Sequence, residues 1–186
     1  MKKIRNPWKT LESKLIYQNS WIKLWGDKVI RPDGKKGIYT YLEKPPGVFV
    51  IAYEDNSIYF LRQFRYVLKK AIIELPAGVV VGHNYLANAK RELFEETGIK
   101  AKNWKLLGKT YCAPGHETTR EYSFLATGLD TKNIRIAQEG DESIISVEKI
   151  KIPKLRQMLA TGKIECGISL AALSLFFNYF YLKKKI

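Results

Sequence analysis

The sequence predicts an α+β domain in which sheets are layered against helices. The first third of the chain reads as short β-rich runs separated by turn residues, one central segment has helical composition, and two more helical segments close the chain. Runs of strands interrupted by a few helices are typical of this class. With 186 residues, of which 46% are hydrophobic and 12% aromatic, the chain can bury a sizeable core.

Tight turns separate the expected strands. Residues 21–30 are rich in β-forming residues, Arg31-Pro32-Asp33-Gly34 is typical of a hairpin turn, and residues 38–42 resume the alternation. The apolar runs 48–53 and 58–63 are joined by Glu54-Asp55-Asn56-Ser57, which favours another turn. Residues 72–78 are expected to be a strand that runs into a loop, and further strands are expected at residues 104–111, 121–129 and 143–149.

Three helices are expected. The central one covers residues 85–97 and ends at Gly98, a residue suited to the left-handed position after a helix. Residues 152–159 form the second, with Pro153 in its first turn. Residues 168–182 form the third. The apolar stretch there is shorter than the roughly 20 residues a membrane-spanning helix needs, so we expect a buried helix and no membrane partner.

The charge of the chain is strongly positive, with 32 Lys+Arg against 18 Asp+Glu and a formal net charge of +14. The lysines are scattered along the whole sequence, whereas phosphate and base recognition favours clustered arginines. We therefore expect a diffuse field that attracts a polyanionic small substrate, and no specific nucleic-acid partner. Cys112 and Cys166 have no metal-binding or disulfide spacing, which favours the reducing cytoplasm.

The segment that carries chemistry is Arg91-Glu92-Leu93-Phe94-Glu95-Glu96-Thr97-Gly98-Ile99. On a helix, Glu92, Glu95 and Glu96 share an arc of about 100°, and Leu86, Ala89 and Leu93 occupy the adjoining arc, which can face a core. Clustered carboxylates suit hard cations such as Mg²⁺ or Mn²⁺. Arg91 is one turn before Glu95 and is placed to orient it. The bare spacing is also typical of a solvated face.

The flanking residues favour the catalytic interpretation, because the segment resembles the Nudix box. The second half of that pattern is Arg-Glu-aliphatic-x-Glu-Glu-x-Gly-aliphatic, and Arg91 through Ile99 match it without a departure. The resemblance implies a Nudix fold, with mixed β-sheets sandwiched between helices and an N-terminal β-rich extension. On this basis residues 1–45 are expected to form N-terminal strands that serve substrate binding or dimerisation, and residues 46–186 the Nudix domain.

The first half of the box departs from the pattern. Gly78 lies 13 positions before Arg91, where the pattern has 14, and His83 stands where the first box glutamate is expected. In the family that glutamate chiefly pairs with the box arginine and supports the loop. We expect the metal site to survive and His83 to be a loop residue, which leaves the partner of Arg91 open.

Other motifs resemble the ADP-ribose pyrophosphatase group of the family. They are Arg62-Gln63-Phe64-Arg65-Tyr66, Glu74-Leu75-Pro76-Ala77-Gly78, Ala113-Pro114-Gly115 and Gly162-Lys163-Ile164. Pro114 lies 15 residues beyond Ile99, the placement associated with ADP-ribose hydrolysis in this family. The similarity covers about residues 12–180. It implies hydrolysis of ADP-ribose, or a related nucleoside diphosphate sugar, to a nucleoside monophosphate and a sugar phosphate.

The resemblance also implies roles for individual residues. Glu92 and Glu96 would be the main Mg²⁺ ligands, with Mn²⁺ as a substitute, and the Ala77 carbonyl a backbone ligand. Glu95 would be either a further ligand or a residue that supports the ligands without binding the ion. Arg91 would support this cluster. The general base would come from the acidic segment Gln138–Ile144, where Glu142 is our first choice and Glu139 the second.

Substrate contacts are implied in the same way. Arg65 would hold the diphosphate and Glu74 would bond a polar group of the substrate, near the loop that carries Pro114. Trp21 and Tyr39 match the positions from which this group stacks the adenine, often across the interface of a homodimer, and the alternative for each is an ordinary core residue. Two alternatives stay open: a hydrolase of GDP-mannose or another nucleotide sugar, and a weakly catalytic module that binds nucleotide or RNA.

Overall fold

A computed structural model of the chain describes residues 5–136 and 143–183. Its described residues fall into two compact units. The first unit consists of residues 5–45 and 111–119, and the second of residues 46–110, 120–136 and 143–183.

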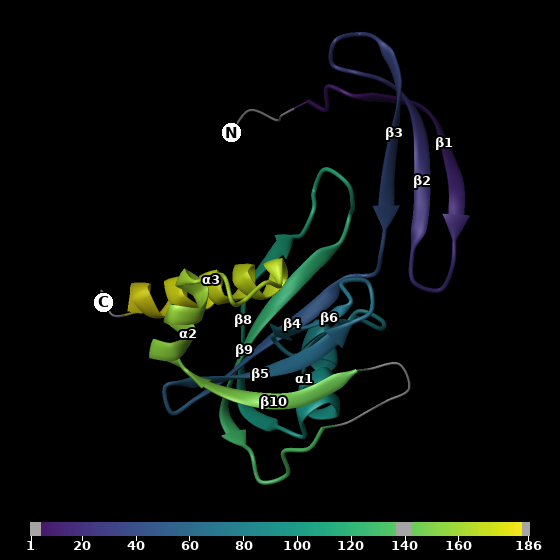
Figure 1. Cartoon of the computed structure of the whole chain (residues 1–186). Coiled ribbons are helices and arrows are strands. Elements are labelled where there is room, and N and C mark those ends of the chain that lie inside the picture. Colours follow the sequence, from purple (N-terminus) through teal and green to yellow (C-terminus); the bar gives the residue numbers. More distant parts are fainter. Residues whose placement is uncertain (1–4, 137–142, 184–186) are drawn as a thin grey trace. The chain divides into compact units, whose positions relative to one another are not determined.

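The first unit is built on an antiparallel three-stranded sheet in the order β1-β2-β3 (Figure 1). The strands are β1 (Lys9–Gln18), β2 (Lys23–Ile30) and β3 (Lys36–Glu43). The expected hairpin turn is confirmed, since the Gly34 N–H donates to the Arg31 carbonyl at 2.9 Å and Gly34 has a φ of +80°. Trp21 lies before β2 and not inside it, which corrects the expected strand start at residue 21.

The segment 111–119 belongs to the first unit because it is bonded to β3. The Leu42 N–H donates to the His116 carbonyl at 2.8 Å, and the Thr118 N–H donates back to the Leu42 carbonyl at 3.1 Å. Tyr39 adds a side-chain bond from its hydroxyl to the Gly115 carbonyl at 2.9 Å. A loop far along the chain is thereby tied to an N-terminal strand.

The second unit contains a seven-stranded mixed sheet. Its main path runs β10-β5-β4-β9-β8, with β6 beside β5 and β7 beside β4. The β4–β9 pair is parallel, whereas β4–β5, β5–β6, β4–β7 and β5–β10 are antiparallel. The strands are β4 (Gly47–Glu54), β5 (Ser57–Arg65), β6 (Lys70–Glu74), β7 (Ala77–Val79), β8 (Lys100–Tyr111), β9 (Arg120–Asp130) and β10 (Ile144–Lys151).

Helices cover both faces of this sheet, as the sequence predicts (Figure 1). Alternate residues of β4 point to opposite faces. Val48, Val50 and Ala52 join one buried cluster with residues of α1 (Tyr85–Thr97). Phe49 and Ile51 join a second cluster with residues of α2 (Ile152–Ala160) and α3 (Gly167–Lys183). The expected α+β arrangement, with a sheet between helices, is confirmed.

The bounds of α1 follow from its two ends. The Asn84 side chain accepts a hydrogen bond from the Ala87 N–H at 2.9 Å, which satisfies a donor of the first turn. Gly98 ends the helix with a φ of 71°, a left-handed conformation that glycine adopts without strain. Ala89 and Leu93 face the core as expected, whereas Leu86 is exposed because it lies in the first turn, at the rim of the packed face.

The C-terminal helix α3 is a packed helix, with Ala172, Leu173 and Phe176 in the core. Within the described part of the chain, no helix combines the length and the apolar character that crossing a membrane requires. Ser169, in the first turn of α3, is fully buried, and its Oγ accepts the Leu75 N–H at 3.0 Å. This bond ties α3 to the Leu75-Pro76 link between β6 and β7.

Replacing Ser169 by alanine should destabilise the second unit. Ser169→Ala leaves the buried Leu75 N–H without this acceptor, which costs about 1–3 kcal/mol. Urea unfolding followed by circular dichroism measures the loss. Ser174→Ala, an exposed serine on the same helix, is the matched control and should stay within about 0.5 kcal/mol of wild type. Equal stabilities for the two variants would contradict the role of this bond.

Candidate active site

Two glutamates of α1 are buried against the short strand β7. Glu92 and Glu96 are 6% and 3% exposed, four residues apart on the same side of the helix. The Glu96 carboxylate accepts the Ala77 N–H at 2.8 Å, which joins the helix directly to the strand. A buried carboxylate is costly without such partners, so this bond fixes where the Glu96 oxygens lie.

Gly78 explains how the strand can come so close to the helix. A Cβ atom built on Gly78 would lie 2.0 Å from Cδ of Glu92, inside the space that the carboxylate occupies. The φ angle of Gly78 is not left-handed, so the requirement is for space and not for an unusual backbone conformation. Any larger residue at this position would push the Glu92 carboxylate away from β7.

Arg91 supplies the positive charge beside these carboxylates. Its guanidinium forms ion pairs with Glu92 and with Glu95. Burial alone would lower the pKa of Arg91, but the charges of Glu92 and Glu95 outweigh it and raise that pKa above its usual value. Arg91 therefore stays protonated, and Glu95 is turned toward it. The expected pairing of Arg91 with Glu95 is confirmed.

Asn88 is a contact of Arg91 in the absence of the first box glutamate. Its side chain accepts the Val81 N–H and donates to the Val81 carbonyl, both at 3.0 Å, and its Oδ1 lies 3.4 Å from an Arg91 nitrogen. His83 is an exposed residue of the turn before α1. Asn88 thus supports the loop on one side and contacts Arg91 on the other. An asparagine inside a helix is unusual in sequence, but the role of Asn88 became visible only with its burial in the structure.

The residues around Glu92 and Glu96 suit a hard cation. Carboxylate oxygens and the nearby backbone of Ala77 and Gly78 are oxygen donors of the kind that Mg²⁺ prefers. Among residues 5–136 and 143–183, no three His, Cys, Asp or Glu side chains are grouped as a metal site by themselves. Mg²⁺ is commonly held by one or two carboxylates together with waters and substrate phosphates, so the carboxylates of Glu92 and Glu96 fit this ion.

Arg65 and Glu74 meet where β5 and β6 lie side by side. The Arg65 Nε donates to the Glu74 carboxylate at 2.6 Å. The Glu74 side chain is 8% exposed and that of Arg65 45%, so the glutamate anchors an arginine that still reaches solvent. Both residues line a cavity of about 510 Å³ in the second unit. This is the arrangement expected of an arginine held ready for an anionic ligand.

Three predicted substrate residues lie in the first unit. The Tyr39 hydroxyl donates to Gly115, the residue after Pro114, so Tyr39 and the Pro114 loop are brought together. Trp8 packs edge-on against the Tyr39 ring, with the ring centroids 5.2 Å apart. Trp21 is 63% exposed, and its backbone N–H donates to the Asn19 side chain at 2.8 Å. Trp21 is therefore not a core residue of the described chain.

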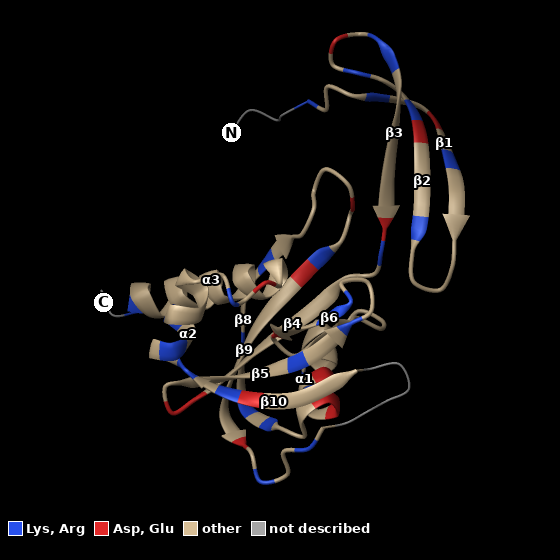
Figure 2. Ribbon diagram, in the orientation of Figure 1, with Lys and Arg blue, Asp and Glu red and all other residues tan. Residues whose placement is uncertain are grey.

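The two residues predicted as general base, Glu142 and Glu139, lie outside the described residues. Figure 2 shows acidic positions gathered on the C-terminal half of α1, and basic positions spread over the strands and helices of both units. The described lysines and arginines do not concentrate on a single element.

Comparisons with known proteins identify both parts of the chain. A family model described as the NUDIX domain matches residues 43–165, and one described as the nucleoside diphosphate sugar hydrolase N-terminal domain matches residues 8–42. A crystal structure described as that of an ADP compounds hydrolase is similar in fold, with a TM-score of 0.84, 15% identity and complete coverage of both chains.

Relatives of similar length agree with these matches. The chain is 32% identical over 142 residues to an ADP-ribose pyrophosphatase of Bacillus subtilis and 31% identical over 142 residues to a methanol dehydrogenase activator of Bacillus methanolicus, in each case covering 75% of this chain and 77% of the relative. It is 30% identical over 167 residues to an ADP-ribose pyrophosphatase of Mycobacterium tuberculosis, covering 87% and 79%. The family match spans more than half of the chain and contains the Arg91–Ile99 segment, so the protein belongs to the Nudix family.

Proposed function

We propose that the protein hydrolyses the diphosphate bond of ADP-ribose or a related nucleoside diphosphate sugar in a reaction that depends on a divalent metal. The products are a nucleoside monophosphate and a sugar phosphate. The observation that carries the proposal is the pair of buried carboxylates, Glu92 and Glu96, held against the Ala77–Gly78 strand. The pyrophosphatase names of two relatives support the substrate class.

Glu92, Glu96 and the Ala77 carbonyl would hold Mg²⁺, with Mn²⁺ as a substitute. When bound, the ion neutralises diphosphate oxygens and lowers the pKa of a coordinated water. The Ala77 N–H orients the Glu96 carboxylate, and the Arg91 guanidinium pairs with that of Glu92. Glu95, paired with Arg91, holds that guanidinium in place and is available as a further ligand. Glu142 stays our choice of general base and Glu139 the alternative.

Arg65 would bind the diphosphate of the substrate. Its Nε is committed to Glu74, which orients the guanidinium, while the exposed part of the side chain can donate to phosphate oxygens. Trp21 offers a flat, exposed ring for the base. Tyr39 would not stack on the base but would position the loop that carries Pro114, through the hydrogen bond from its hydroxyl to the Gly115 carbonyl. That loop would then help to shape the substrate site.

A homodimer is part of the proposal. Every residue of β1 is exposed, including Leu11, Leu15, Ile16 and Tyr17, and an apolar strand with this exposure is usually covered by a partner. A second copy of the chain is the simplest cover. Sedimentation equilibrium should give the mass of two chains, and a monomer at micromolar concentration would contradict this assignment.

We also place the protein in the cytoplasm. Cys166 is a free, partly buried cysteine. A reducing compartment preserves free thiols, whereas secreted proteins tend to pair them.

The experiment that tests the function is an assay against a panel of nucleotide sugars. The panel contains ADP-ribose, GDP-mannose and other nucleoside diphosphate sugars, each incubated with Mg²⁺ or with a chelator, and the products are separated chromatographically. We expect Mg²⁺-dependent release of AMP from ADP-ribose. Preferential release of GMP would assign the GDP-mannose alternative, and no metal-dependent product from any substrate would overturn the hydrolase proposal.

Glu96→Gln should abolish most of the activity. The substitution keeps the size of the side chain but removes a charge directed at the ion, so kcat should fall by about two or more orders of magnitude. Steady-state kinetics at saturating Mg²⁺ measure the fall. Asp55→Asn, which removes an exposed carboxylate that pairs with Lys149 in the turn between β4 and β5, is the control and should retain kcat. Near-wild-type turnover by Glu96→Gln would contradict the metal assignment.

Trp21→Ala should raise KM more than it lowers kcat. Stacking acts on the ground state and the transition state alike, and its loss costs on the order of 1–3 kcal/mol per base. Because the ring is exposed, the variant should fold normally. Tyr181→Ala, which removes an exposed ring near the end of α3, serves as the control. An unchanged KM for Trp21→Ala would remove Trp21 from the substrate site.

A further inference from the structure

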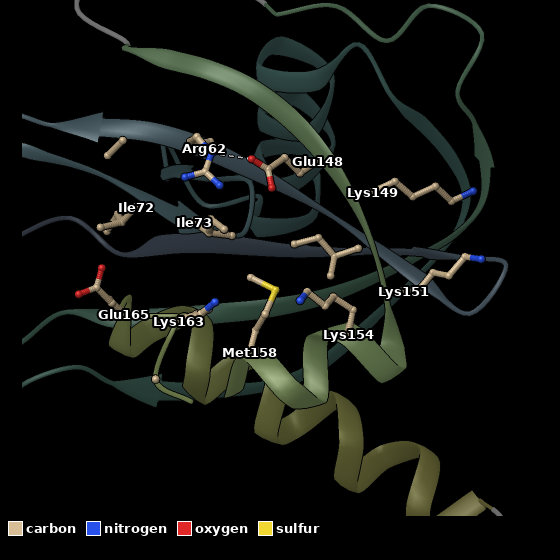
Figure 3. Close-up of a pocket in the computed structure, with 13 residues that line it drawn as sticks. Arg62, Ile72, Ile73, Glu148, Lys149, Lys151, Lys154, Met158, Lys163 and Glu165 are labelled. Carbon is tan, nitrogen blue, oxygen red and sulfur yellow. Dashed lines mark hydrogen bonds and ion pairs between the residues drawn. The ribbon is translucent and has the colours of Figure 1, made fainter. Parts of the chain in front are cut away.

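A second cavity of about 850 Å³ lies in the second unit, between the β5–β6 hairpin, β10 and α2 (Figure 3). Its apolar lining includes Ile73 of β6, Ile150 of β10 and Met158 of α2. Pockets of about 300–1,000 Å³ are the size that holds drug-sized ligands. The cavity is therefore large enough for a small organic molecule.

This cavity is separate from the carboxylates of α1. Ile73, Ile150 and Met158 of its lining belong to the buried cluster that includes α2 and α3, whereas α1 packs against the other cluster of the sheet. The cavity adjoins the one that Arg65 and Glu74 line, because Ile72 and Glu165 line both.

The charges around the cavity leave an excess of positive charge. The two acidic residues of the lining are already paired, Glu148 with Arg62 at 2.6 Å and Glu165 with Lys70 at 2.5 Å. Within residues 5–136 and 143–183, no carboxylate lies in ion-pair range of Lys154 or Lys163. The Lys154 ammonium has only a neutral contact, with the Gln157 side chain at 3.2 Å.

Figure 3 shows where these two amines lie. The ammonium groups of Lys154 and Lys163 flank the Met158 side chain on one side of the cavity, and the Arg62–Glu148 pair occupies the other side. Two unneutralised ammonium groups beside an apolar surface suit a molecule with an anionic end and a flat apolar body. Lysine is a common phosphate ligand, and methionine sulfur contacts aromatic rings favourably.

We propose that this cavity binds a nucleoside monophosphate, with the phosphate between Lys154 and Lys163 and the base on Ile73, Ile150 and Met158. The ligand would contact the hairpin that carries Arg65 and Glu74, beside the cavity that those two residues line. The site is thus a nucleotide site apart from the carboxylates of α1, and it does not depend on the catalytic metal.

The methionine content of the chain makes a direct test simple. The sequence has two methionines, Met1 and Met158, and the second lines the cavity. Protein labelled with ¹³C at the methionine methyl groups is titrated with AMP in the presence of a chelator, and Met158→Leu assigns the Met158 signal. Adenosine and inorganic phosphate are titrated separately. Lys154→Gln/Lys163→Gln is the test variant, and Lys132→Gln, on an exposed turn, is the matched control.

We expect AMP to shift the Met158 signal with a Kd below about 1 mM, and adenosine and phosphate to bind more weakly. The double variant should bind AMP at least about tenfold more weakly, and Lys132→Gln equally well. Trp21→Ala should leave the titration unchanged, which separates this site from the catalytic one. An AMP-insensitive Met158 signal, equal affinity in the double variant, or phosphate binding as tight as AMP would each overturn the proposal. Turnover of ADP-ribose by the double variant tests the catalytic function separately.

Discussion

The hydrogen bond from the Ala77 N–H to the Glu96 carboxylate, together with the contact of Gly78 with Glu92, sets the geometry on which the candidate site depends. These contacts join a helix to a strand only three residues long, β7. They also hold two carboxylates in a nearly buried position, where they would be unfavourable without partners. The rest of the second unit keeps this contact in place. Val80 bonds to the Pro46 carbonyl, and Ser169 fixes the Leu75-Pro76 link that leads into β7.

The electrostatics of the site follow from the same arrangement. Three carboxylates and one guanidinium leave two negative charges along one side of α1, which a divalent cation can neutralise. The surface elsewhere is strongly basic, because the chain carries a net charge of +14 and its basic positions are spread over both units (Figure 2). A polyanionic substrate would be attracted by that general field and oriented by Arg65, which Glu74 holds.

Local signals made much of the fold predictable. The span of α1 and its end at Gly98, the Asp55-Asn56 turn with φ values of 49° and 53°, and the apolar runs of β4 and β5 depend on neighbouring residues, and the structure confirms them. Strand β1 was not predicted as a separate element. Its sequence, KTLESKLIYQ, lacks regular alternation, and the strand is held by pairing with β2.

The candidate site was predictable only in part. The carboxylate cluster and the Arg91–Glu95 pair follow from helical spacing. The role of Asn88 depends on the path of a loop seven residues away, and the bond from Tyr39 to Gly115 spans 76 positions of sequence. No local pattern specifies such contacts, because they form only when distant strands are paired. Residues 111–119 belong to the first unit for the same reason, because they bond to a strand that is distant in sequence.

The central claim is that the close contact of β7 with Glu92 and Glu96 forms the metal site. It is tested most directly by measuring Mn²⁺ binding to a variant that alters β7 and leaves both carboxylates in the sequence. Gly78→Ala places a methyl group where the Glu92 carboxylate lies, and Gly167→Ala adds one where no atom lies within 4 Å. Electron paramagnetic resonance measures free Mn²⁺ during titration, without reference to catalysis. We expect Gly78→Ala to stay folded with a lower unfolding midpoint and to weaken Mn²⁺ binding by about 10–100-fold, and Gly167→Ala to bind as wild type does. Wild-type affinity in a folded Gly78→Ala protein would contradict the account.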